Sequence, residues 1–217
     1  MSIEKESLRS VIMEKLRADF LATASQWQAE QADIERILRL LLTTYGDVKR
    51  HYHGLGHIQQ MMNLAEQYRD DIQQWHSFYF AIWFHDFIQQ NSGDNEGMSA
   101  EIAAEFLAQL NVPTEIIKYC AELILATKQH GYQPDTDMQL FVDIDLSILA
   151  ADRALYKSYA SKCRKEYSLP DFVYRFGRKR FLNGMLSREY IFSSNVFRQQ
   201  KEQVARDNIQ WELEAWL

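Results

Sequence analysis

The chain has 217 residues, of which 47% are hydrophobic and 25% are charged, and its formal net charge is −6. These values suit a globular chain with a sizeable core, and the acidic balance argues against general nucleic-acid binding. The two cysteines lack the spacing of a metal-binding pair and fit a reducing cytoplasm. The sequence shows neither an apolar signal core nor the roughly 20 apolar residues of a membrane span, so we expect a cytoplasmic protein that does not bind membranes.

Helical periodicity of apolar residues runs through nearly the whole chain, and the alternation typical of strands is absent. Glycine, proline and capping residues separate the helical segments. The pattern therefore predicts an all-α protein. In chain order, helices are expected over residues 8–20, 28–44, from His57 to about 69, across the apolar run 78–88, from a cap at Asn95 or Ser99 to Leu110, from Pro113 to near His130, around Asp145, and over 152–167, 171–186 and 195–217.

A His-Asp pair, His85-Asp86, lies in the apolar segment that runs from Phe78 to Ile88. Apolar residues occupy every angle of this segment, so a helix here should be buried on most sides. A buried carboxylate is costly unless its charge is compensated. A metal ion is the simplest compensation, because imidazole nitrogen and carboxylate oxygen are both good ligands, whereas an ion pair with an arginine such as Arg50 is the alternative.

Further candidate ligands lie on either side of this pair. His53 and His57 are four residues apart, which on a helix puts them on one face, and we place His57 in the first turn of its helix with His53 just before it. Downstream, Asp143 and Asp145 lie two apart among apolar residues, so on a helix they point to different sides. We therefore expect only one of the two to face the site and the other to be paired or partly exposed.

The order of His57, His85-Asp86 and Asp145 resembles the ligand series of the HD-domain superfamily of metal-dependent phosphohydrolases. The stretch from Tyr52 to His57 also resembles the start of the site in cyclic-nucleotide phosphodiesterases, a distant branch of the same fold. The layout resembles a bacterial branch described only as predicted HD phosphohydrolases. The resemblance implies that His57, His85, Asp86 and Asp145 bind the metal.

The same resemblance implies a multi-helix HD-domain bundle that forms a single domain over residues 1–217. Its metal-binding core would cover about 50–150, and 151–217 would be a helical C-terminal extension. By similarity to the phosphodiesterase pattern, His53 would be the catalytic general acid, and the alternative is that His53 orients Asp86 or a water. The final helix could also bury its apolar face in a homodimer.

Two imidazoles and two carboxylates suit a divalent transition metal (manganese, iron, cobalt, nickel or zinc) better than calcium or magnesium. Such an ion lowers the pKa of a bound water to about 7 and provides a nucleophile for phosphorus. We therefore expect a metal-dependent phosphohydrolase whose substrate is a small phosphate ester, with nucleotides included. The alternatives are a diiron oxygenase on the same fold and a nucleotide-binding sensor or interaction module with little turnover.

Four further residues are candidates for catalysis or substrate binding. Glu96 could orient the attacking water and Asn95 could hold a substrate oxygen, although both also fit a solvated loop with a helix cap. His130 could contact substrate or a second metal, or it could cap the end of a helix. Arg178 is the arginine that we expect to turn inward and bind a phosphate, because guanidinium binds phosphate through two parallel hydrogen bonds.

Overall fold

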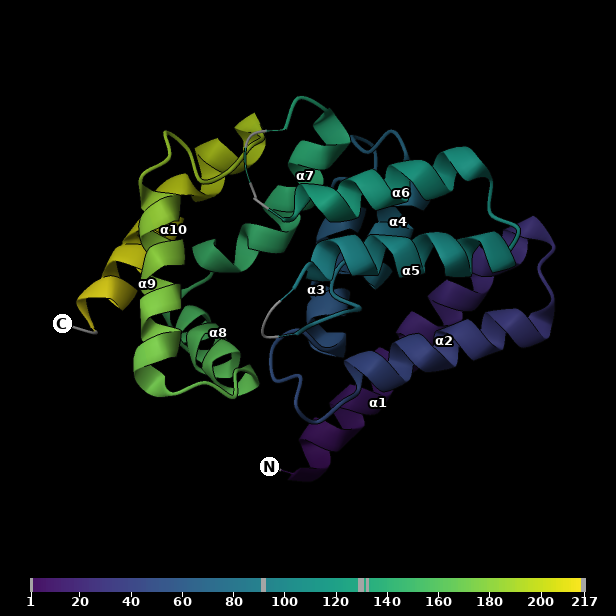
Figure 1. Ribbon diagram of the computed structural model, residues 1–217, viewed down its shortest axis with the longest axis horizontal. Coiled ribbons are helices and arrows are strands. Elements are labelled where there is room, and N and C mark those ends of the chain that lie inside the picture. The colour runs from purple at the N-terminus through teal and green to yellow at the C-terminus, as the bar shows by residue number, and fades with distance from the viewer. Residues whose placement is uncertain (1, 91–92, 129–130, 132, 216–217) are drawn as a thin grey trace. The chain divides into compact units, whose positions relative to one another are not determined.

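The computed structural model describes residues 2–90, 93–128, 131 and 133–215, with side chains from residue 10 onward (Figure 1). Within these residues it contains ten α-helices, two 3₁₀ helices and no strand, which confirms the predicted all-α fold. The chain forms two compact units, Met1–Lys128 and Gln129–Leu217. The division therefore falls before the extension that was expected to begin at residue 151, and the single domain stays a prediction.

The described part of the first unit contains six α-helices and one 3₁₀ helix. Helix α5 packs along α6, α6 packs on α4, and α1 packs on both α2 and α3 (Figure 1). The elements are α1 (Ser2–Ala24), η1 (Ser25–Trp27), α2 (Gln31–Tyr45), α3 (Leu55–Gln67), α4 (Trp75–Phe84), α5 (Asn95–Gln109) and α6 (Thr114–Ala126).

Helix α4 is the most buried element of the first unit. Every residue from Ser77 to Phe84 is buried, as its apolar character on all sides predicts. Its end is attached to α2, because the hydroxyl of Tyr45 donates a hydrogen bond of 2.7 Å to the carbonyl oxygen of Trp83. The segment that carries His85 and Asp86 therefore begins at a helix end whose position is fixed by this hydrogen bond.

In the second unit, the 3₁₀ helix η2 packs on α7, α8 and α10, and α10 also packs on α9. The Asn208 side chain in α10 fixes the turn after η2, because its amide donates to the carbonyl oxygens of Leu149 and Ala151 at 2.8 Å each. The elements are α7 (Thr136–Leu146), η2 (Ser147–Ala150), α8 (Arg153–Glu166), α9 (Asp171–Leu186) and α10 (Asn195–Glu214).

The predicted helix bounds agree best where caps and prolines mark the ends. The expectation of 171–186 matches α9, and 152–167 lies within one residue of α8 at each end. The first helix is longer than the expected 8–20, because its first turns are polar and carry no apolar periodicity, and at its other end the mainly apolar residues 21–24 continue it. None of the helices in the described residues combines the length and apolar character that crossing a membrane requires.

Candidate metal centre

His85 and Asp86 follow directly after α4, which ends at Phe84. The expectation that they lie inside a helix was wrong, because the chain turns here and the N–H of Phe87 donates to the carbonyl oxygen of Phe84 at 3.0 Å. Successive residues of a helix point about 100° apart. The turn instead brings the two neighbouring side chains to one point, with His85 Nε2 and Asp86 Oδ2 separated by 3.2 Å.

His57 lies in the first turn of α3 and His53 lies two residues before that helix, as predicted. The helix can begin here because Gly54 has no side chain. A Cβ at Gly54 would lie 2.9 Å from the carbonyl oxygen of Tyr45 and 3.1 Å from that of Arg50. Gly54 therefore permits a close backbone contact that positions the start of α3, whereas a Cβ at Gly56 would meet open space.

Three potential ligand atoms converge at this place. His57 Nε2 lies 3.2 Å from His85 Nε2 and 3.8 Å from Asp86 Oδ2, and the remaining distance, between His85 Nε2 and Asp86 Oδ2, is 3.2 Å. Both imidazoles are buried, while the Asp86 side chain is 26% exposed. We call this cluster of His57, His85 and Asp86 the metal centre.

Two of the three distances within the metal centre, those of 3.2 Å, match the spacing of ligand atoms around a shared ion, and the third, between His57 Nε2 and Asp86 Oδ2, is longer at 3.8 Å. An ion about 2.1 Å from each ligand holds neighbouring ligand atoms about 3.0 to 3.4 Å apart in octahedral or tetrahedral geometry. His85 is also oriented as metal-binding histidines usually are, because its Nδ1–H donates to the carbonyl oxygen of Ile82 at 2.9 Å. In the neutral ring this leaves the lone pair on Nε2, the atom that faces His57 and Asp86. These side chains could therefore hold a metal ion.

The electrostatics of the cluster keep Asp86 in its ligating form. Burial acts to raise the pKa of the Asp86 carboxyl, whereas the charges of His85, His53 and His57 lower it, and the net result is a pKa below the ordinary value. The carboxyl is consequently ionised at neutral pH, which is the state that binds a cation.

Arg50 holds the turn that carries Asp86, although it does not neutralise the carboxylate. Its guanidinium donates to the backbone carbonyl oxygens of Asp86 at 2.6 Å, Phe87 at 2.8 Å and His53 at 3.2 Å. It also lies over the ring of Tyr45, with 5.0 Å from Cζ to the ring centre. Arg50 therefore ties the segment around His53 to the segment around Asp86 through backbone contacts.

His53 lies beside the metal centre, with its ring centre 5.8 Å from that of His57. Its Nδ1 contacts the side-chain amide of Gln89 at 2.9 Å. An amide carries both a donor and an acceptor, so Gln89 can hold the ring whether Nδ1 is protonated or not. Sequence reasoning did not identify Gln89, and its only signal is that it is the first polar residue after the apolar run.

The start of α5 organises the chain after the His-Asp pair. The Asn95 amide pairs with both backbone groups of Gln90, at 3.0 and 3.1 Å, so it closes a loop, and the helix cap is Asp94 rather than Asn95 or Ser99. The Ser99 hydroxyl accepts the N–H of Ile88 at 3.0 Å. Glu96 lies half-buried in the first turn of α5, and the proposed roles of Asn95 and Glu96 stay predictions.

The two downstream acids belong to α7 in the second unit. Asp143 is buried and accepts the N–H groups of Ser193 at 2.6 Å and Ser194 at 2.7 Å, so it is a paired acid. Burial raises its pKa to about 6, although those hydrogen bonds act to lower it. Asp145 is half-buried in α7, and its role as a metal ligand stays a prediction. His130 lies outside the described residues.

Arg178 turns inward, as expected, but its partner is an acidic side chain. Its Nε and Nη2 donate to the two carboxylate oxygens of Glu212 at 3.0 and 3.1 Å, and its Nη1 donates to the hydroxyl of Tyr159 at 3.1 Å. All three guanidinium nitrogens are therefore engaged inside the second unit. The predicted phosphate-binding role of Arg178 stays a prediction, and it would require breaking a buried ion pair.

Comparison of the chain with protein-family models, with curated proteins and with solved structures gives no match in any of the three. The geometry of the metal centre comes from two segments of the first unit, the start of α3 and the turn after α4.

Proposed function

We propose that the chain is a metal-dependent phosphohydrolase that acts on small phosphate esters, nucleotides among them. The observation that carries the proposal is the convergence of His57 Nε2, His85 Nε2 and Asp86 Oδ2 within 3.8 Å of one another. The resemblance of the ligand order to HD-domain phosphohydrolases supplies the reaction class. Two nitrogens and one oxygen favour manganese, iron, cobalt, nickel or zinc.

In this proposal Asp145 is the fourth ligand, on the basis of the sequence resemblance alone. A divalent ion bound by these side chains would lower the pKa of a water and neutralise charge on the phosphoryl group. Arg50 would keep the Asp86 carboxylate in position through the backbone carbonyl that it binds. Since Arg50 binds the backbone carbonyl oxygen of Asp86, its guanidinium does not occupy the carboxylate oxygens.

His53 is proposed as the group that protonates the leaving oxygen. Gln89 contacts its Nδ1 and so helps to fix the orientation of the ring. Histidine changes its charge near neutral pH, which suits proton transfer. The sequence predictions of a cytoplasmic location and of a homodimer stay predictions.

The test is hydrolysis of p-nitrophenyl phosphate and bis(p-nitrophenyl) phosphate by protein reconstituted with manganese, iron or zinc. We expect turnover of at least one ester, and we expect His53→Gln to lower turnover while its metal content is unchanged. The matched control is His51→Gln, since His51 is an exposed neighbour and should retain full turnover. Bound metal without hydrolysis of either ester or of a nucleotide panel would contradict the phosphohydrolase and favour the sensor alternative.

A further inference from the structure

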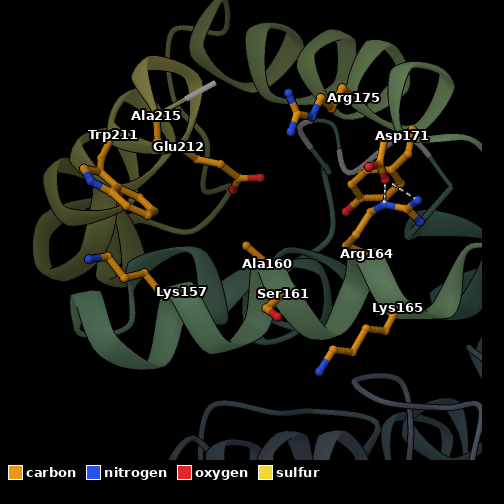
Figure 2. Close-up of a pocket in the computed structure, with 11 residues that line it drawn as sticks. Lys157, Ala160, Ser161, Arg164, Lys165, Asp171, Arg175, Trp211, Glu212 and Ala215 are labelled. Carbon is orange, nitrogen blue, oxygen red and sulfur yellow. Dashed lines mark hydrogen bonds and ion pairs between the residues drawn. The ribbon is translucent and has the colours of Figure 1, made fainter. Parts of the chain in front are cut away.

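The second unit contains a cavity of about 360 Å³ between α8, α9 and α10. In Figure 2, Lys157, Ala160 and Ser161 rise from α8, Arg175 lies on the opposite side, and Trp211 and Glu212 approach from α10. The volume is at the lower end of the roughly 300–1,000 Å³ that is usual for small-molecule pockets. All lining residues belong to the second unit, and none of them is a residue of the metal centre.

The charge of the lining is predominantly positive. The lining contains four basic residues (Lys157, Arg164, Lys165 and Arg175) and two acidic residues (Asp171 and Glu212). Both acids are already paired, Asp171 with Arg164 at 2.5 Å and Glu212 with Arg178 at 3.0 Å. The charges of Arg164 and Arg175 both lower the pKa of the Asp171 carboxyl, so this one carboxylate is shared between two guanidinium groups. With four basic and two acidic residues, the lining keeps a net positive charge.

One wall of the cavity is aromatic. Trp211 projects from α10 toward α8, with the ammonium of Lys157 4.7 Å from the centre of its ring (Figure 2). Arg153, one turn earlier on α8, places its guanidinium carbon 5.0 Å from the same ring. Trp211 and Ala160 supply apolar surface next to the cations, which is the combination that binds a planar ring carrying an anionic group.

We propose that this cavity binds a small phosphorylated molecule with a planar ring, of the nucleoside monophosphate class. The guanidinium of Arg175 and the ammonium of Lys157 hold the phosphate, since both are strong donors to phosphate oxygens. The ring of the ligand packs on Trp211, because aromatic side chains bind bases by stacking. This requires the Lys157 ammonium to move from its place over the Trp211 ring to the phosphate. Glu212 lines the cavity, but it is paired with Arg178 and so is not part of the anion site.

The test is calorimetric titration of the full chain with AMP in the presence of EDTA, so that the metal centre holds no ion. Adenosine and ribose 5-phosphate are titrated in parallel, because each has only one of the two recognised groups. We expect AMP to bind at one site, and we expect both fragments to bind at least about tenfold more weakly.

Two substitutions on α9 locate the site. Arg175→Ala should weaken AMP binding by about tenfold or more, whereas Arg180→Ala, an exposed arginine that does not line the cavity, should change it less than about twofold. Thermal unfolding of both variants checks that the second unit is intact. The proposal is overturned if AMP does not bind, if Arg175→Ala binds as the parent does, or if ribose 5-phosphate binds as tightly as AMP.

Discussion

Each unit contains a buried group of ionisable side chains, and the two groups are built differently. In the second unit, Arg178 and Glu212 form a two-point ion pair, with Glu212 also accepting the hydroxyl of Tyr156 at 2.5 Å. In the first unit, two imidazoles and the carboxylate of Asp86 converge, and the nearby Arg50 binds a backbone carbonyl instead of the carboxylate. One group is neutralised by side chains, and the other offers lone pairs to a cation.

A structural ion pair and a metal-binding site differ in what compensates the buried charge, which is another side chain in the first case and an ion in the second. A buried pair whose members satisfy each other needs nothing further, and breaking it destabilises the fold. A cluster of nitrogen and oxygen ligands is most stable with an ion bound. Replacing one of these ligands should therefore reduce metal binding before it reduces the stability of the fold. Substitutions in the ion pair should therefore mainly lower stability, whereas substitutions of the metal ligands should mainly lower metal binding.

The largest expected effect is that of Asp86→Asn on metal content. The amide keeps the shape of the side chain but loses the charge, so we expect the bound metal to fall below about a tenth of the parent's content, measured by elemental mass spectrometry after reconstitution. Asp70→Asn, at an exposed acid, is the control and should bind as the parent does. Full metal content in Asp86→Asn would show that the metal centre is misassigned.

The next largest effect is that of Arg178→Met on stability. Glu212, whose side chain is 2% exposed, would stay buried without its cation, so the free energy of unfolding should fall by about 3 kcal/mol. Chemical denaturation measures this change, and metal content should be unchanged. Arg180→Met on the same helix should alter stability by less than about 0.5 kcal/mol. An equal loss in both variants would contradict the structural role of the pair.

Gly54→Ala tests whether a close backbone contact positions the metal centre. The added Cβ would lie 2.9 Å from the carbonyl oxygen of Tyr45, so we expect a loss of about 2 kcal/mol in stability and weaker metal binding. Gly56→Ala is the matched control, because its Cβ meets open space and alanine favours a helix by up to about 1 kcal/mol. If both variants unfold at the same denaturant concentration, the contact is unimportant.

The smallest effect expected is that of Arg50→Lys. A lysine ammonium cannot reproduce the fork by which Arg50 holds the carbonyl oxygens of Asp86 and Phe87, so stability should fall by about 1 kcal/mol. Metal affinity should fall less than in Asp86→Asn. Arg39→Lys, at an exposed position, provides the comparison. If Arg50→Lys keeps both the metal affinity and the stability of the parent, Arg50 does not hold the turn that carries Asp86.

The sequence predicted the metal centre largely because its signals are local. A charged pair inside an apolar run requires compensation, and His57 lies where the apolar helical pattern of α3 puts it. The turn after Phe84 was not predictable, because no glycine or proline follows it and the Arg50 contacts that hold it come from 36 and 37 residues away. The partner of Arg178 was missed for the same reason, since Glu212 lies 34 residues further along the chain.

Metal content of the parent protein tests the central claim most directly. The chain is stripped with a chelator, reconstituted separately with manganese, iron, cobalt, nickel and zinc, freed of excess ion, and measured by elemental mass spectrometry. The account predicts about one tightly bound ion per chain for at least one of these metals, and a higher melting temperature when that ion is bound. A chain that retains none of the five metals and melts at the same temperature with and without them would contradict it.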